Sequence, residues 1–130
     1  MRHALLLTAV LVCLTVSTVP AQDPVQVDSK HYKVEVDNEQ VRVLRVHLGP
    51  KESSPMHEHP PGVVITQTDV HLKFTFPDGK TEERTATAGS VRYRPAVKHA
   101  AENLNDKDFE AIEVELKAAS AASKKAEKKQ

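Results

Sequence analysis

The sequence predicts an all-β domain, a sandwich or barrel built from about nine short strands. Three observations support this class. Short segments alternate apolar and polar side chains or are rich in β-branched residues, turn-forming Gly, Pro, Asn and Asp separate these segments, and no segment has convincing helical periodicity. Many short strands with frequent turns favour closure or sheet pairing, because both arrangements protect the strand edges.

Four strands are predicted in the first half of the domain. Residues 30–36 and 40–48 alternate, and Gly49-Pro50 ends the second segment. The segment around residues 57–59 is extended, because prolines on both sides exclude a continuous helical turn. Residues 63–68 form a β-branched run, in which alternation from Val63 through Ile65 predicts that Gln67 faces the cavity.

The second half continues with a hairpin and three more strands. Asp78-Gly79 is a strong turn signal between residues 70–76 and 81–86. The first arm is expected to contribute Phe74 and Phe76 to packing rather than to ligand stacking. The remaining strands are predicted at 91–94, 98–103 and 109–116, the last with Ile112, Val114 and Leu116 facing inward.

The first 21 residues have the layout of a secretory signal peptide: a charged start, an apolar run and small residues before Gln22. The apolar run is short for an uncleaved membrane anchor, which needs about 20 residues. A lipoprotein would use Cys13, but the residue before it is not small. We therefore expect a secreted or periplasmic protein that has no cysteine after cleavage and is not stably inserted in a membrane.

One domain, at residues 22–116, fills the rest of the chain up to a flexible Ala/Ser/Lys-rich tail at residues 117–130. With Arg2, the five tail lysines and the tail residue Glu127 set aside, residues 22–116 hold 12 basic and 17 acidic groups, a net charge of −5. An acidic domain is a poor nucleic-acid partner. The tail is a solvated end or a contact for an anionic surface, and a homodimer is left open.

A histidine pair is the most informative feature of the sequence. His57 and His59 lie two residues apart on an extended segment, so both point to one face while Glu58 points away. Two imidazoles in this arrangement can share a metal ion. With four glycines in the chain, no glycine-rich nucleotide loop competes with this site.

Two motifs in residues 41–116 resemble those of the cupin superfamily. The first cupin motif runs from a glycine through a histidine pair to a glutamate, and its matches here are Gly49, His57 and His59. The second motif is matched by Gly89, Pro95, His99 and Asn103, with a loop one residue short. The resemblance implies a double-stranded β-helix, or jelly-roll barrel, whose three histidines, His57, His59 and His99, bind a divalent transition metal.

The chain departs from the family at the glutamate of the first motif, which falls on Val63 or Val64. Three neutral imidazoles still suffice for Fe, Mn, Zn, Ni or Cu, and such a site keeps the full charge of its ion and should prefer an anionic ligand. The alternative is a metal-free barrel in which the histidines form a polar patch.

Other polar residues are weaker candidates. Gln67 and Arg45 are candidate substrate contacts, although Arg45 shares a strand side with His47, which is typical of a solvent-facing surface. His31 and His71 are expected to be exposed, and Arg92 and Arg94 to lie on a salt-bridged outer surface. Glu102 is out of phase with His99 and is a poor fourth ligand.

Two functions follow from these predictions. The first is an exported mononuclear metal oxygenase, isomerase or lyase that acts on a small polar molecule, with no general acid or base identified. The second is a barrel that binds a small ligand without turnover.

Overall fold

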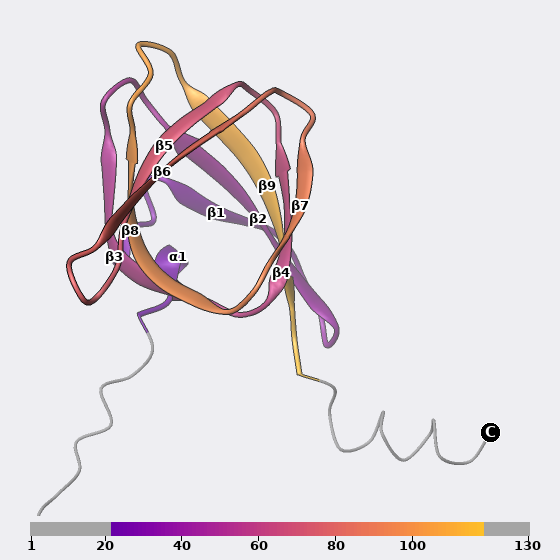
Figure 1. Ribbon diagram of the computed structural model, residues 1–130. Helices are drawn as coiled ribbons and strands as arrows, with labels where there is room; N and C mark the ends of the chain where they lie inside the picture. Colours follow the sequence, from indigo (N-terminus) through magenta and orange to yellow (C-terminus); the bar gives the residue numbers. More distant parts are fainter. Residues whose placement is uncertain (1–21, 119–130) are drawn as a thin grey trace, which may run out of the picture.

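The computed structural model describes residues 22–118, which form a barrel of nine strands and one short helix (Figure 1). The order is α1 (Pro24–Val27), β1 (Tyr32–Asp37), β2 (Val41–Leu48), β3 (Ser53–His59), β4 (Gly62–Thr66), β5 (Val70–Thr75), β6 (Thr81–Ala86), β7 (Val91–Arg94), β8 (Val97–Asn103) and β9 (Phe109–Leu116). The all-β prediction is confirmed. The predicted signal peptide and nearly all of the predicted tail lie outside the described residues.

Two antiparallel sheets face each other across the barrel. The five-stranded sheet has the order β1-β2-β9-β4-β7, and the four-stranded sheet has the order β3-β8-β5-β6. Strands distant in sequence are therefore neighbours, as in the pairing of β2 with β9 and of β3 with β8. The core between the sheets is made of Tyr32, Leu44, Val46, Leu48, Val64, Val70, Leu72, Phe74, Ala101, Phe109 and Ala111.

Helix α1 was not predicted. Asp23 caps it by accepting a hydrogen bond from the backbone N–H of Val25 at 2.9 Å, and Pro24 occupies its first turn. The helix is one turn long and lies against β1 and β3. Within residues 22–118, no helix has the length and apolar character needed to cross a bilayer.

Gly62 and Gly79 occupy positions that demand glycine. A Cβ atom at Gly62 would lie 2.3 Å from the carbonyl oxygen of Val114, so only glycine lets β4 approach β9 this closely. Gly79 has a φ of 81° and closes the β5–β6 turn by donating its N–H to the carbonyl of Phe76 at 2.9 Å. The predicted hairpin is confirmed.

Strand β9 faces the opposite way to the prediction. Phe109, Ala111 and Glu115 are buried on its inner side, whereas Leu116 is 43% exposed. The apolar alternation of Ile112, Val114 and Leu116 belongs to the outer face of the five-stranded sheet. The prediction was wrong because alternation identifies two faces of a strand but does not say which one is buried.

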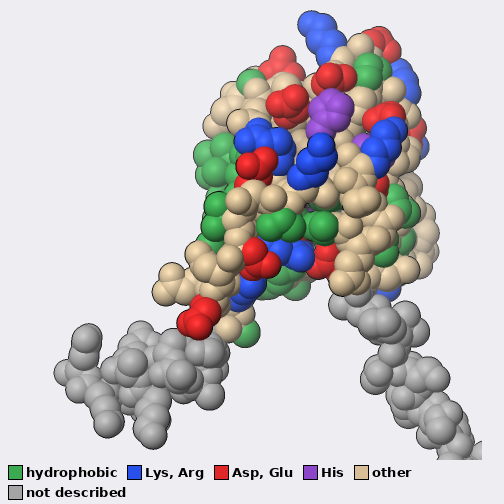
Figure 2. All heavy atoms as spheres, turned by 180° about the vertical axis from the view of Figure 1, so that it is seen from behind, with side chains coloured by type: hydrophobic (Ala, Val, Ile, Leu, Met, Phe, Trp, Pro, Cys, Tyr) green, Lys and Arg blue, Asp and Glu red, His purple; other side chains and the backbone are tan. Residues whose placement is uncertain are grey.

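The outer face of the five-stranded sheet carries a transverse row of apolar side chains. Cross-strand pairing aligns one residue from each strand, namely Val36, Val43, Val114, Val63 and Tyr93. Tyr93 is 62% exposed. Figure 2, which shows the molecule from behind, has acidic and basic side chains interspersed across the visible face, with hydrophobic ones at both edges and in its middle.

Candidate metal centre

The three predicted ligands meet inside the barrel. His57, His59 and His99 are all buried, and each offers one ring nitrogen to a group whose nitrogens lie within 4.8 Å of one another. Their ring centroids are 4.7 Å apart for His57 and His59, 5.0 Å for His57 and His99, and 5.5 Å for His59 and His99. The shared face predicted for His57 and His59 is confirmed.

Strand pairing explains the convergence. His57 on β3 is the direct partner of His99 on β8, so their side chains lie on the same face of the four-stranded sheet. His59 follows two residues later on that face. The register shifts between Ser54 and His57, and this irregularity sets which residues of β3 are paired opposite His99.

Hydrogen bonds orient the ring of His57. Its Nδ1 lies 2.7 Å from the carbonyl oxygen of Pro55 and must donate to it, which leaves Nε2 as the acceptor nitrogen. The hydroxyl of Tyr32 lies 3.2 Å from that Nε2 and donates to it. Burial raises the pKa of the Tyr32 phenol, so this group stays protonated and acts as a hydrogen-bond donor.

A buried ion pair orients the ring of His59. Its Nδ1 donates to Oε1 of Glu115 at 2.8 Å, and Oε2 of Glu115 accepts from Nε of Arg42 at 2.7 Å. Burial alone would raise the pKa of Glu115, but the hydrogen bonds from His59 and Arg42 hold it below its ordinary value. Among the described residues, Nε2 of His59 is buried and has no hydrogen-bond partner.

Burial keeps the other two histidines neutral at pH 7. It lowers the pKa of His57 to about 4 and that of His99 to about 2, with smaller contributions from the neighbouring histidines. Neutral imidazole is the form that binds a metal ion.

The ring of His99 is supported by an aromatic stack. Phe74 on β5 lies parallel to it, with ring centroids 4.8 Å apart and an interplanar angle of 23°. The guanidinium of Arg84 lies over the ring of Phe74, 5.5 Å from the ring centroid. The expectation that Phe74 packs in the core is confirmed by its burial, but the residue also forms a wall of the site.

The donor set fits a divalent transition metal. His59 has an unpartnered buried nitrogen, and both His57 and His59 donate their Nδ1 proton to a fixed acceptor, as metal-bound histidines commonly do. A metal would compete with one hydrogen bond, from Tyr32 to His57. That bond is worth about 1 kcal/mol net, against about 10–16 kcal/mol for a structural zinc site.

Gln67 and Arg45, the predicted substrate contacts, lie outside the barrel. Gln67 is exposed and accepts a hydrogen bond from Nη1 of Arg45 at 3.2 Å, while Arg45 also pairs with Glu35. The inward parity expected for Gln67 was wrong, because Val64 and Thr66 face the core instead. Neither side chain reaches a ligand held at the three histidines.

The alternation of inward and outward side chains along β4 also shows which valine takes the place of the glutamate of the first motif. Val63 lies on the outer face of β4, and Val64 is 5% exposed and lines the cavity next to the histidines. Glu113 is the cross-strand neighbour of Val64 on β9. Its Oε2 lies 3.3 Å from Nδ1 of His59, so a carboxylate does approach the site, but from a different strand.

Arginines also face inward, contrary to the expectation of a salt-bridged outer surface. Arg94 is 3% exposed and Arg92 is half-buried, and both line the cavity beside His99. Tyr93, which lies between them, points to solvent. Only the tertiary structure shows that the two arginines of β7 face the interior. A strand that alternates arginine and tyrosine carries no sequence signal that its arginine side is the buried one.

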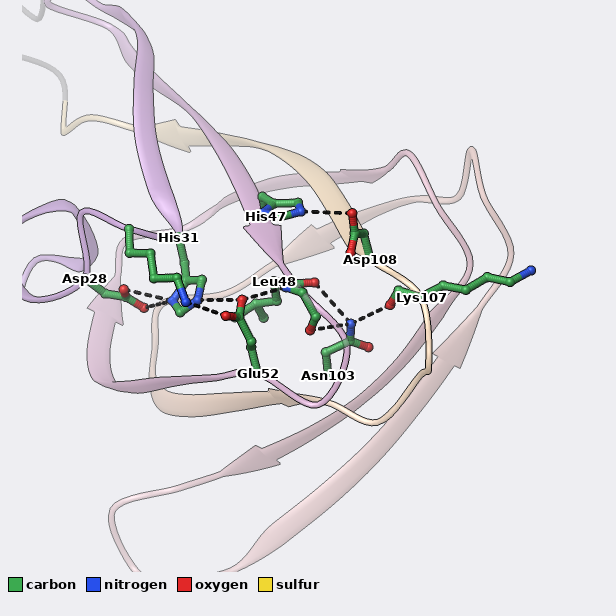
Figure 3. A network of polar contacts seen from close by, with 10 residues as sticks. Asp28, His31, His47, Leu48, Glu52, Asn103, Lys107 and Asp108 are labelled. Atoms are coloured by element: carbon green, nitrogen blue, oxygen red, sulfur yellow. Dashed lines mark hydrogen bonds and ion pairs between the residues drawn. The ribbon is translucent and has the colours of Figure 1, made fainter.

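His31 is buried and not exposed as expected. Figure 3 shows it between two carboxylates: Nδ1 lies 2.7 Å from Oδ2 of Asp28, and Nε2 lies 3.1 Å from Oε2 of Glu52. Glu52 also accepts the N–H of Gly49 at 2.8 Å and pairs with Lys30. These contacts hold the pKa of Glu52 down at about 2 and fix the loop that leads into β3.

Asn103, the last residue matched to the second motif, has a structural role. Figure 3 shows its Nδ2 donating to the carbonyls of Leu48 at 3.1 Å, Gly49 at 3.1 Å and Lys107 at 2.8 Å. This side chain joins the end of β2, the end of β8 and the turn before β9. His71 is half-buried and its side chain pairs with Glu83, so the expectation of an exposed residue is met only in part. Glu102, predicted to be a poor fourth ligand, is also half-buried and pairs with Lys73 rather than joining the histidine group.

Similar structures were found by comparison with solved structures. A cupin domain from Bordetella pertussis is 31% identical with a TM-score of 0.63, over 67% of this chain and 92% of that chain. An RmlC-like cupin family protein from Methanocaldococcus jannaschii is 24% identical with a TM-score of 0.51, over 68% and 83% of the two chains. A Cupin 2 conserved barrel domain protein from Salinispora arenicola is 22% identical with a TM-score of 0.51, over 76% and 83%.

The two less similar structures support the fold alone. Scans against protein-family models and curated proteins returned no match.

Proposed function

This chain belongs to the cupin superfamily, and on that premise we propose that it holds one divalent transition metal on His57, His59 and His99 and uses it on a small molecule inside the barrel. The observation that carries the proposal is the convergence of three buried ring nitrogens within 4.8 Å of one another. Fe, Mn, Zn, Ni and Cu all accept such a set of imidazoles. The reaction class is that of a mononuclear oxygenase, isomerase or lyase.

A bound metal supplies Lewis acidity, or activation of O₂ or water, at this position. The chain itself orients the ligands and excludes water. Glu115 fixes the ring of His59, and Phe74 fixes the plane of His99. Tyr32, which is protonated and buried beside His57, can donate a hydrogen bond but cannot act as a base at neutral pH. Glu113 is the acidic group that lines the cavity.

Metal content and turnover test the proposal in sequence. Protein purified from its own host should contain about one equivalent of a transition metal by mass spectrometry. His99→Ala should lose the metal, and His71→Ala should keep it, because the side chain of His71 is 40% exposed and pairs with Glu83. No metal uptake at neutral pH would contradict the metal site. Ligand binding without any product would support the non-catalytic barrel.

Export is part of the proposal. It rests on the charged start, apolar run and small residues of the first 21 positions. Intact-mass measurement of the native protein should find Gln22 or a near neighbour at the amino terminus. A cytosolic protein that retains Met1 would contradict export.

A homodimer stays a prediction, and the apolar row centred on Val114 is the surface it would bury. Light scattering of the protein, with Tyr93→Lys as the perturbed variant, measures the molar mass. A dimer in the wild type that dissociates in this variant would support the prediction.

A further inference from the structure

Arg94 carries a buried guanidinium that the described residues leave without a hydrogen bond. The residue is 3% exposed, and Nε, Nη1 and Nη2 are all buried with no acceptor within residues 22–118. The carboxylate of Glu113 comes nearest, 3.4 Å from Nη2, and this oxygen makes no hydrogen bond either. A buried cation without hydrogen bonds is costly, so this group calls for an anionic partner.

Two further arginines face the same space. Arg92 precedes Arg94 by two residues on β7, and Arg84 reaches in from β6. Arg84 pairs with Glu82. Glu113 is then the acidic residue that lines the cavity with Arg92 and Arg94, so two positive charges face one negative charge. Burial lowers the pKa of Arg92, and repulsion from Arg84 and Arg94 lowers it further.

The space beside the arginines can hold a small molecule. Two adjoining cavities, of about 60 and 200 Å³, are both lined by Phe74, Arg84, Arg92, Arg94 and His99. The smaller cavity extends between apolar side chains, namely Val46, Leu48, Val64, Val70, Leu72, Ala101 and Phe109. An occupant of both regions has a charged end at the arginines and a short apolar body.

We propose that Arg94 and Arg92 bind the carboxylate of a small organic acid, whose apolar part occupies the cavity beside His99. A carboxylate accepts two parallel hydrogen bonds from one guanidinium, which would satisfy the nitrogens that Glu113 leaves unpaired. The inference rests on the proposed function in one respect, since the acid is then the substrate class of the metal site. Binding of the acid itself needs only the arginines and the cavity.

The test is binding of butyrate to the full chain freed of metal with a chelator, measured by titration calorimetry and by the Arg Nε–H signals in NMR. Butyrate should bind at least ten times more tightly than butyramide, which has the same shape without the charge. Inorganic phosphate, which has charge but no apolar body, should bind more weakly than butyrate. Equal binding of butyrate and butyramide would overturn the proposal.

Variants locate the site. Arg94→Gln and Arg92→Gln should each weaken butyrate binding about tenfold or more, and Arg45→Gln, on the outer surface, should leave it unchanged. Glu113→Gln should tighten it several-fold, because it removes the carboxylate that faces the arginines. If Arg94→Gln does not fold, Arg92→Gln and Glu113→Gln decide. Unchanged affinity in the folded variants would refute the proposal.

Metal uptake by the same variants separates this inference from the proposed function. Loss of butyrate binding with normal metal content in Arg92→Gln supports the arginine site as distinct from the histidines. A wild-type chain that takes up metal but binds no butyrate refutes the inference alone. A chain that binds butyrate through Arg94 but takes up no metal supports the acid site and contradicts the metal function.

Discussion

Replacing Glu115 by Gln should weaken metal binding through His59, although Glu115 is not itself one of the three ligands. Its Oε1 accepts the Nδ1 proton of His59 at 2.8 Å, which makes the opposite nitrogen a better electron donor. Gln keeps the size and one acceptor oxygen. The substitution therefore changes the charge of the acceptor with little change in shape.

The expected size follows from the hydrogen bond. A bond to a charged group contributes about 1.5–3 kcal/mol and one between neutral groups about 0.5–1.5 kcal/mol. The difference of about 1–1.5 kcal/mol corresponds to metal affinity about ten times weaker, since 1.4 kcal/mol is a factor of ten. This lies at the lower end of the range of about 10–100-fold found for such outer partners.

The assay is competition for Zn²⁺ with a chromophoric chelator at pH 7.5. Glu58→Gln is the matched control, because Glu58 lies between the two histidines in sequence but pairs with Lys98 at 3.2 Å on the other side of the strand. Urea unfolding of the metal-free proteins reports any loss of the Arg42 ion pair separately. Equal affinities for Glu115→Gln and Glu58→Gln would refute the reasoning.

Three further results are expected. Phe74→Ala should destabilise the metal-free protein by about 3–5 kcal/mol in urea unfolding, because Phe74 is 7% exposed and supports His99; a loss below about 1 kcal/mol would contradict its burial. Acidification should remove the stability that Glu52 contributes: its pKa is lowered to about 2 in the folded protein, so this contribution is complete above the unfolded pKa near 4.5 and is lost as pH falls from there towards 2. Glu52→Gln should flatten the pH dependence of unfolding in that window, and an unchanged profile would argue against the contacts. Val64→Glu should raise Mn²⁺ affinity by adding an oxygen ligand, whereas Val63→Glu, on the outer face, should not; equal effects would contradict the parity of β4.

The apolar periods and turn residues of the sequence were enough to predict the strands. Each of the nine observed strands overlaps a segment predicted as extended, and Asp78-Gly79 forms the predicted turn. The grouping of the histidines was also predictable. His57 and His59 are two residues apart, and local geometry alone places them on one face.

Strand positions, the shared face of the histidine pair and the family resemblance that brought in His99 could be predicted without a structure, because they depend on local conformation and on motif order. Tertiary structure decided which face of each strand became the interior. In β9, Ile112, Val114 and Leu116 lie on the outer face, and Glu113 and Glu115 point toward the histidines. In β7 it was Arg94 that turned inward. Alternation is symmetric between the two faces of a strand, so the choice depends on cross-strand partners distant in sequence, which also set the charges around the metal centre.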